Sequence, residues 1–402
     1  MTNFLKRIFK TVLILVTLLF FLGSFDSSRA QENRASGTTR FVFDGNRMYA
    51  ELAFVRPDGT LHRALAFVDL GSPATVLSQS LFKELQIDRK RPLTYRVGEM
   101  TVHVDAADVT SEEDWFPIPV GGDLPVEALV PAGVMQNFLV VMDYQHRTLT
   151  LAQPAALKPE GTAVPFHVNK KTGLLAVDAT IDGHSYPITI DNGSAYTWLR
   201  KSTVEEWLRV HPEWRRGEGA VGASNMRMAD DGIEIGGILM RIPEIKLGGL
   251  SLRQIGALGI GPNDKGVDLI DWYSQKNYGP VLGFLGGNVL QGFKLTVDYP
   301  NRMIYWLKQT DLDPHDLDQI GLTLKFKDNA YYVAAIATQN GKPTVEGVRV
   351  GDKLMRVGEQ KLEGAPWGTI FTALHGEPGE SRTLVLERDG TQVTIRAKVT
   401  RF

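Results

Sequence analysis

The sequence of 402 residues contains no cysteine. This absence excludes disulfides, a thiol nucleophile, a cysteine-ligated zinc site and a lipid-anchored signal. The eight histidines are scattered, and they form no HExxH or similar metal-ligand spacing. We therefore expect no metal and no other cofactor. A chain of this length can bury a core large enough to fold without cross-links.

An excess of charge of one sign is also lacking. The 44 Lys and Arg nearly balance the 46 Asp and Glu, which leaves a formal net charge of −2. No basic patch emerges, so nucleic acid is not an expected partner. The hydrophobic share of 43% is ordinary for a globular protein, and the length predicts more than one domain.

Long apolar runs are scarce. One run, TVLILVTLLFFLG at 11–23, follows three basic residues and precedes small residues up to Ala30. This pattern predicts a signal peptide over residues 1–30 and an exported protein, periplasmic or secreted. The run falls short of the roughly 20 residues of a bilayer span. A form anchored by an uncleaved segment is the alternative.

One short pattern occurs twice, 122 positions apart. FVDLGS at 67–72 and TIDNGS at 189–194 each follow an apolar strand, place an aspartate at its end, and continue through one variable residue into Gly-Ser. A hairpin pattern precedes each copy, and a short helical segment follows it. The chain therefore contains an internal repeat.

A second repeat closes each half of the chain. FLVVMDYQHRTLTL at 138–151 and FKLTVDYPNRMIYW at 293–306 share Phe, Asp-Tyr and Arg at a constant offset of 155. Duplication at this scale predicts two copies of one supersecondary unit. We expect a mainly β fold with two pseudo-symmetric lobes, at 31–155 and 160–308.

The remaining residues form a third region. TDLDPHDLDQI at 310–320 carries four aspartates and a proline, which predicts a solvent-exposed linker. Residues 321–402 alternate strand patterns with a possible helix near 367–376. We expect a small α+β domain there.

The paired aspartates, Asp69 and Asp191, carry the functional argument. A single aspartate in such a turn usually satisfies local backbone amides. Two copies in related lobes that pack about a local two-fold would lie face to face. Carboxylates about 3 Å apart would repel by roughly 5 kcal/mol at an effective dielectric near 20, so they would share one proton. Such a pair can activate a water while polarising a carbonyl, which is acid–base hydrolysis of an amide.

These motifs resemble the pepsin/retropepsin type of aspartic peptidase. The resemblance covers roughly 50–308 and includes VLGFLGGNVLQGF at 281–293, which resembles the segment that threads beneath the active-site turn. It implies an endopeptidase in which the two aspartates form the catalytic pair. It also implies supporting groups: amides near Gly71 and Gly193 for the inner carboxylate oxygens, and the hydroxyls of Ser72 and Ser194 for the outer ones.

A flap should cover the cleft of such an enzyme. The alternating segment at 92–105 has Gly98 in its middle and is the candidate hairpin, with Tyr95 as its flap aromatic. An alternating segment of this kind is equally consistent with an ordinary sheet strand. The flap is therefore an expectation that depends on the resemblance.

Two positions and one segment depart from the family pattern. Leu70 and Asn192 stand where a hydroxyl residue bonds across to the opposite lobe, so this lock must be missing or asymmetric. The counterpart of VLGFLG is VEALVP at 126–131, which lacks the glycines. These departures motivate an alternative, an inactive peptide-binding or scaffold protein. A serine peptidase fails because no GxSxG or GNSGG turn exists.

The last region resembles a PDZ domain. GVRVGDKLMRVGEQKLEG at 347–364 and HGEPGESRTLVLERDG at 375–390 carry this resemblance. It implies strand addition of a C-terminal peptide, with Gly321, Leu322, Thr323 and Leu324 as the carboxylate loop. The alternative is a domain that packs on the lobes and binds nothing. The expected partners are a peptide or protein substrate and a peptide ligand, and we expect a monomer.

Overall fold

The computed structural model describes residues 35–88, 91–113, 118–219, 235–263 and 265–402. Strands dominate this part of the chain and the helices are short, so the prediction of a mainly β fold is confirmed. The predicted signal segment lies outside the described residues. Among the described residues, no helix has the length and apolar character that a bilayer span requires.

A six-strand sheet joins the two halves of the chain. Its strand order is β1 (Ser36–Asp44), β10 (Thr148–Ala152), β9 (Leu139–Asp143), β19 (Phe293–Asp298), β20 (Met303–Lys308) and β11 (Thr162–Val168). Val141 of β9 lies opposite Thr296 of β19, its equivalent 155 positions later in the sequence. A residue that faces its own repeat marks a local two-fold, as the sequence repeat predicts.

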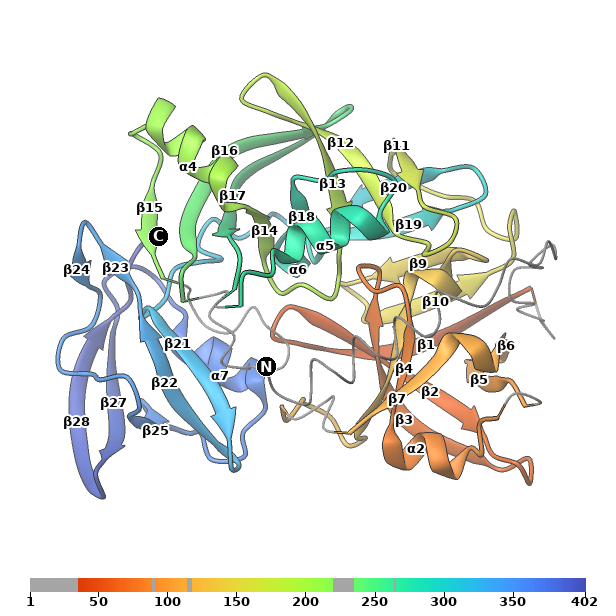
Figure 1. Ribbon diagram of the computed structural model, residues 1–402, viewed down its shortest axis with the longest axis horizontal. Coiled ribbons are helices and arrows are strands. Elements are labelled where there is room, and N and C mark those ends of the chain that lie inside the picture. Colours follow the sequence, from red (N-terminus) through yellow and green to blue (C-terminus); the bar gives the residue numbers. More distant parts are fainter. Residues whose placement is uncertain (1–34, 89–90, 114–117, 220–234, 264) are drawn as a thin grey trace.

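Each half repeats the same strand pairings beside this sheet. In the first, β3 (Leu61–Asp69) runs parallel to β8 (Val126–Pro131), and β4 (Thr75–Ser78) pairs antiparallel with β8 and parallel with β7 (Val109–Glu112). In the second, β13 (His184–Ile190), β18 (Gly283–Leu285), β14 (Thr197–Arg200) and β17 (Leu250–Ile260) repeat this arrangement. The two halves are called the first and second lobes below, and Figure 1 shows them in orange-yellow and green.

The remaining elements of the lobes complete each core. They are β2 (Arg47–Val55), α2 (Gln79–Glu84), β5 (Leu93–Val97), β6 (Met100–Val104), η1 (Ala106–Asp108), α3 (Ala132–Met135), β12 (Leu175–Ile181), α4 (Lys201–Val210), β15 (Arg216–Glu218), β16 (Ile238–Leu247), α5 (Leu269–Lys276) and α6 (Gly287–Leu290). The hairpin turn before β13 shows how local sequence sets the strands. Asp182 and Gly183 both have positive φ, 48° and 77°, as a two-residue hairpin turn requires.

The C-terminal unit has a sheet of its own, drawn in blue in Figure 1. Its order is β21 (Leu322–Lys327), β22 (Ala330–Ile336), β25 (Lys353–Val357), β27 (Ser381–Arg388) and β28 (Thr391–Lys398), with β26 (Gln360–Lys361) beside β25. The helix α7 (Trp367–Leu374) packs on this sheet through Trp367 and Ile370. The short strands β23 (Thr338–Gln339) and β24 (Lys342–Pro343) connect the unit to β15 of the second lobe.

The expectation of a solvent-exposed linker at 310–320 is wrong for its second half. Asp316 and Asp318 are buried, with exposed fractions of 8% and 0%. The guanidinium of Arg241 on β16 explains this burial, because its Nη1 lies 2.9 Å from Asp316 Oδ1 and its Nη2 lies 3.7 Å from Asp318 Oδ1. A buried cation supplies the partner that the acidic sequence alone could not reveal.

Candidate active site

Equivalent strands deliver Asp69 and Asp191 to the junction of the lobes. Asp69 is the last residue of β3, and its neighbour on the parallel strand β8 is Pro131. Asp191 follows β13 directly, and its amide donates to the carbonyl of Leu285 on β18 at 3.0 Å. Each aspartate is therefore held by a parallel strand pair inside its own lobe.

The two aspartates meet. Their side chains hydrogen-bond to each other, and only 8% of Asp69 and 5% of Asp191 is exposed. The amide of Gly71 donates to Asp69 Oδ1 and the amide of Gly193 to Asp191 Oδ1, both at 2.8 Å. The geometry of the predicted glycine amides is therefore present in both lobes.

The turns also interlock at their glycines. A Cβ atom at Gly71 would lie 2.5 Å from the carboxyl carbon of Asp191, and one at Gly193 would lie 2.5 Å from that of Asp69. Contacts this short do not occur between real side chains, so each turn admits the opposing carboxyl only because it has glycine there. The repeated Gly is thus explained by close approach across the two-fold.

Burial perturbs the pKa of both carboxyls, and the charge of Asp191 perturbs that of Asp69 as well. Burial and then the charge of Asp191 raise the pKa of Asp69 well above its ordinary value. Burial also raises the pKa of Asp191, while the hydrogen bond from Asp69 and two turn amides lower it. Both carboxyls therefore favour their protonated form, as expected of a pair that holds one proton between its members.

The bond across the lobes is asymmetric. Asn192 Nδ2 donates to the carbonyl of Val68 at 2.7 Å, and Asn192 Oδ1 accepts from the amide of Leu70 at 2.8 Å. One carboxamide therefore makes both bonds toward the first lobe, while Leu70 is completely buried and contributes only its backbone. The departure at Leu70 removes the symmetry of the lock but leaves a lock in place.

The prediction for the serine hydroxyls is wrong. Ser72 Oγ donates to the carbonyl of Ala74 at 3.4 Å, and Ser194 Oγ donates to that of Tyr196 at 2.6 Å. Each hydroxyl closes its own turn because a carbonyl two residues ahead is the nearer acceptor. In the second lobe, the amide of Ser194 donates to Asp191 Oδ1 at 3.2 Å.

The segment VEALVP keeps its structural place despite its missing glycines. It forms β8, which pairs with both β3 and β4 as β18 pairs with β13 and β14. The amide of Ala132 after it donates to Ser72 O at 3.1 Å, and the equivalent bond runs from Gly287 to Ser194 at 2.7 Å. Despite its different sequence, this segment therefore supports the first turn with the same pairings that β18 makes under the second turn.

Tyr95 is not a flap residue in this structure. The segment at 92–105 does form a hairpin of β5 and β6, but β5 pairs with β2 and Tyr95 is 1% exposed in the first-lobe core. Its ring lies 5.8 Å from that of Phe54. The alternating pattern correctly predicted the two strands of this hairpin. It did not predict that the Tyr95 side of the hairpin would be buried in the lobe core.

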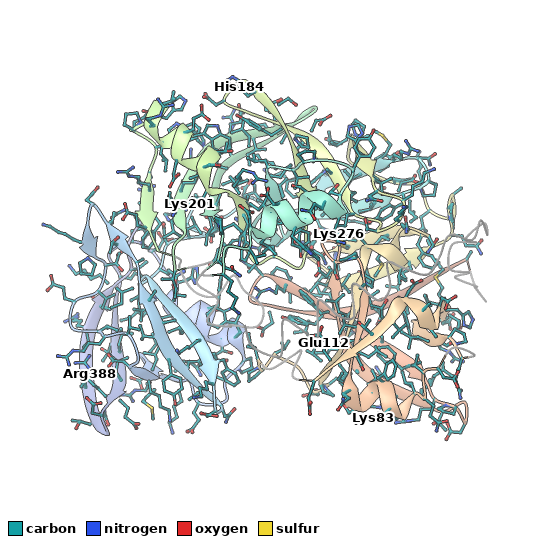
Figure 2. The ribbon with its side chains drawn as sticks, in the orientation of Figure 1. Lys83, Glu112, His184, Lys201, Lys276 and Arg388 are labelled. Carbon is teal, nitrogen blue, oxygen red and sulfur yellow. The ribbon has the colours of Figure 1, made fainter. Side chains whose placement is uncertain are left out.

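Two side chains near the aspartates were missed from the sequence. Arg47, at the start of β2, is buried and its Nε donates to the carbonyl of Gly193 at 3.0 Å. Tyr273 on α5 packs on Phe284 of β18 with ring centroids 4.7 Å apart, and the charges of both aspartates raise the pKa of its phenol further above its already burial-raised value. Lys276, labelled in Figure 2, marks the C-terminal end of α5.

The proposed carboxylate loop of the C-terminal unit is buried. Leu322, Thr323 and Leu324 form the start of β21 with exposed fractions of 0 to 3%, and the carbonyl of Gly321 accepts from Ala337 at 2.8 Å. The preceding amide of Ile320 donates to Leu374 at the end of α7. Peptide binding at this loop stays a prediction.

The first lobe also contacts the C-terminal unit. Asp44, at the tip of the β1–β2 hairpin, accepts from the amide of Gly368 in α7 at 2.7 Å and from that of Gly121 at 3.0 Å. The amide of Trp367 donates to the carbonyl of Pro119 at 3.0 Å. The unit therefore packs on the first lobe, as the predicted alternative has it, and ligand binding stays a prediction.

Comparison with known proteins gives little guidance. No family model matches the chain, and no curated protein matches it. A solved structure titled photosystem II D1 C-terminal processing protease shares 20% identity over 21% of this chain, with a TM-score of 0.19. The match spans 23% of that structure's chain. A likeness of this size supports no assignment of function.

Proposed function

We propose that this protein is an exported aspartic-type endopeptidase. One observation carries the proposal: two buried carboxyls, Asp69 and Asp191, hydrogen-bond to each other at the ends of equivalent strands. A pair that shares a proton contains both a general base and a general acid at neutral or mildly acidic pH. The C-terminal PDZ-like unit would bind a substrate or partner peptide.

The reaction follows from the state of the pair. The ionised aspartate of the pair takes a proton from a bound water, whose oxygen attacks the carbonyl carbon of the peptide bond. The protonated aspartate of the pair donates its proton to the carbonyl oxygen, which gives a tetrahedral diol. Transfer of a proton to the amide nitrogen then breaks the C–N bond and releases an amine and a carboxylic acid. No covalent enzyme intermediate forms.

The inactive scaffold is the second candidate, and Leu70 is the observation that favours it. With no hydroxyl at position 70, the first lobe makes no side-chain bond from this position to the second, so the aspartates could be kept for structure while turnover is lost. Tight binding of extended peptides without cleavage between pH 3 and pH 8 would favour this alternative.

The test is cleavage of an unfolded protein substrate across that pH range, with the products identified by mass spectrometry. We expect a bell-shaped pH dependence, inhibition by a statin-type transition-state mimic, and loss of cleavage in Asp69→Asn and in Asp191→Asn. Asp58→Asn, at an exposed turn, is the matched control and should cleave normally. Cleavage that survives either active-site change would refute the mechanism.

A further inference from the structure

The buried Arg47 breaks the symmetry of the two lobes. Tyr49 pairs with Phe67 two residues before Asp69, and Ala176 pairs with Thr189 two residues before Asp191. Counting back two residues from each partner places Arg47 in the first lobe and Leu174 in the second. Both side chains are buried, with exposed fractions of 1% and 0%. The first lobe therefore has a cation where the second has an apolar side chain.

A buried cation needs a compensating environment. A charged side chain without partners in the interior costs on the order of several kcal/mol. The second lobe avoids this cost, because the apolar Leu174 occupies the equivalent position. Arg47 is instead held by specific groups: Nε donates to the carbonyl of Gly193, and its guanidinium hydrogen-bonds to the phenol of Tyr49. The contact with Gly193 crosses from the first lobe to the turn of the second.

The position of Gly193 connects Arg47 to both carboxyls. Its amide donates to Asp191, and its Cα lies against the carboxyl of Asp69. The guanidinium of Arg47, bonded to the carbonyl of Gly193, is therefore one residue removed from both carboxyls. The charge of Arg47 lowers the pKa of Asp69 and of Asp191, each by less than burial raises it.

Among the described residues, the titratable groups that interact with the pair or with Arg47 include the phenols of Tyr49, Tyr144 and Tyr273 and the carboxylate of Asp44. Tyr273 faces the aspartates from α5, and Tyr144 faces Asp191 from the turn after β9. Burial raises the pKa of both phenols, so they stay neutral through the pH range of the reaction. Asp44 faces Arg47 across the hairpin, with its oxygens bonded to two backbone amides.

We propose that Arg47 is a positioning residue of the aspartate pair, which holds the second turn through Gly193 and offsets the single negative charge of the pair that shares one proton. The inference rests on the proposed function and adds to it the cation that stabilises the singly ionised aspartate pair in the protein interior. Low dielectric strengthens this interaction as it strengthens the repulsion between the two carboxylates.

The first test is the pH–rate profile of peptide cleavage by the full chain. Without the cation, losing a proton from the pair becomes less favourable, so both limbs of the profile of Arg47→Leu should move to higher pH by about one unit. Arg47→Lys keeps the charge and loses the planar donor, so its limbs should stay in place while kcat falls. Arg40→Leu changes the net charge equally on the exposed part of β1 and should match the unchanged chain.

The second test needs no turnover. Infrared spectroscopy follows the carboxyl stretch of the buried protonated pair during a pH titration, and Asp69→Asn identifies the band. In Arg47→Leu the band should persist to a pH about one unit higher. A chain that cleaves nothing but shows this shift would refute the proposed function and support the role of Arg47.

Two results would overturn the role of Arg47. One is a profile of Arg47→Leu with the limbs in their original places and a lower rate, which describes a merely structural residue. The other is a carboxyl band that titrates at the same pH in both chains. Should Arg47→Leu not fold, Arg47→Gln, which keeps a donor without the charge, gives the same two readouts.

Discussion

Asn192 reaches from the second lobe to the backbone on both sides of Asp69, because its side chain donates to Val68 and accepts from the amide of Leu70. Leu70 makes no equivalent bond to the second lobe, because its side chain has no polar atom. At the position after each aspartate, the hydrogen bonds between the lobes therefore come from one carboxamide.

Replacing that carboxamide should be costly. Asn192→Ala leaves a buried donor and a buried acceptor without partners, and we expect the free energy of unfolding to fall by about 3 kcal/mol, with a large loss of cleavage. Thermal unfolding of the variant measures this directly. Asn301→Ala, at an exposed turn beside Asp298, should change the midpoint little. A midpoint for Asn192→Ala equal to the parent's would contradict the assigned lock.

The pair of carboxyls should limit stability at neutral pH. The pKa of Asp69 is raised in the folded chain, so below its ordinary unfolded pKa of about 3.9 both states are protonated and nothing is lost. As the pH rises through the folded pKa, the folded state resists ionisation and the free energy of unfolding falls. Asp69→Asn cannot ionise, so its melting temperature should exceed the parent's at pH 7 and equal it near pH 3. A difference that does not vary with pH would argue against a raised pKa.

The glycines of the two turns should tolerate no side chain. Gly71→Ala and Gly193→Ala each place a methyl group 2.5 Å from the opposite carboxyl, so we expect loss of activity and a clear drop in stability. Gly279→Ala is the matched control, because a Cβ there meets nothing within 4 Å and its φ is not positive. Measured unfolding curves and cleavage rates for the three variants check this. Activity in either turn variant would mean that the aspartates do not approach as described.

Asp44 should stabilise the C-terminal unit from a distance of 324 positions in the sequence. Its carboxylate accepts from the second amide of α7, whose own cap residue, Pro366, makes no side-chain bond to the helix. We expect Asp44→Ala to cost about 1 kcal/mol, the usual value of a lost N-cap, and Asp44→Asn to cost less. Chemical denaturation of both variants measures the difference. Equal stability of Asp44→Ala and the parent would show that the contact contributes nothing.

Much of this fold was visible in the sequence because it is repeated there. The alternating segments before Asp69 and Asp191 predict strands by local pattern, and the constant offset of 155 predicts a symmetric joining sheet, in which Val141 faces Thr296. Side-chain destinations were harder to predict. Tyr95 occupies a strand as expected, but alternation does not say which neighbour covers a face.

The misses at Arg47 and at the linker aspartates share one cause, which is that their partners lie far away in the sequence. Arg47 was not singled out because a lone arginine at the start of a strand looks like a surface residue, and only the three-dimensional fold brings it to Gly193. Asp316 and Asp318 looked solvent-exposed for the same reason, since Arg241 lies about 75 positions earlier. Ser72 and Ser194 are a different case, because each hydroxyl donates to a carbonyl two residues ahead in its own turn.

The buried ion pairs of Arg241 also determine how the C-terminal unit can move. A domain that moves on a flexible linker needs a solvent-exposed hinge, whereas here the second half of the linker is buried against Arg241 of the second lobe. Separating the C-terminal unit from the second lobe would leave the buried guanidinium of Arg241 without its carboxylate partners. We therefore expect the two lobes and the C-terminal unit to unfold in one transition. If a peptide bound to the C-terminal unit affects the aspartates, this coupling must then pass through the packed contacts between the unit and the lobes.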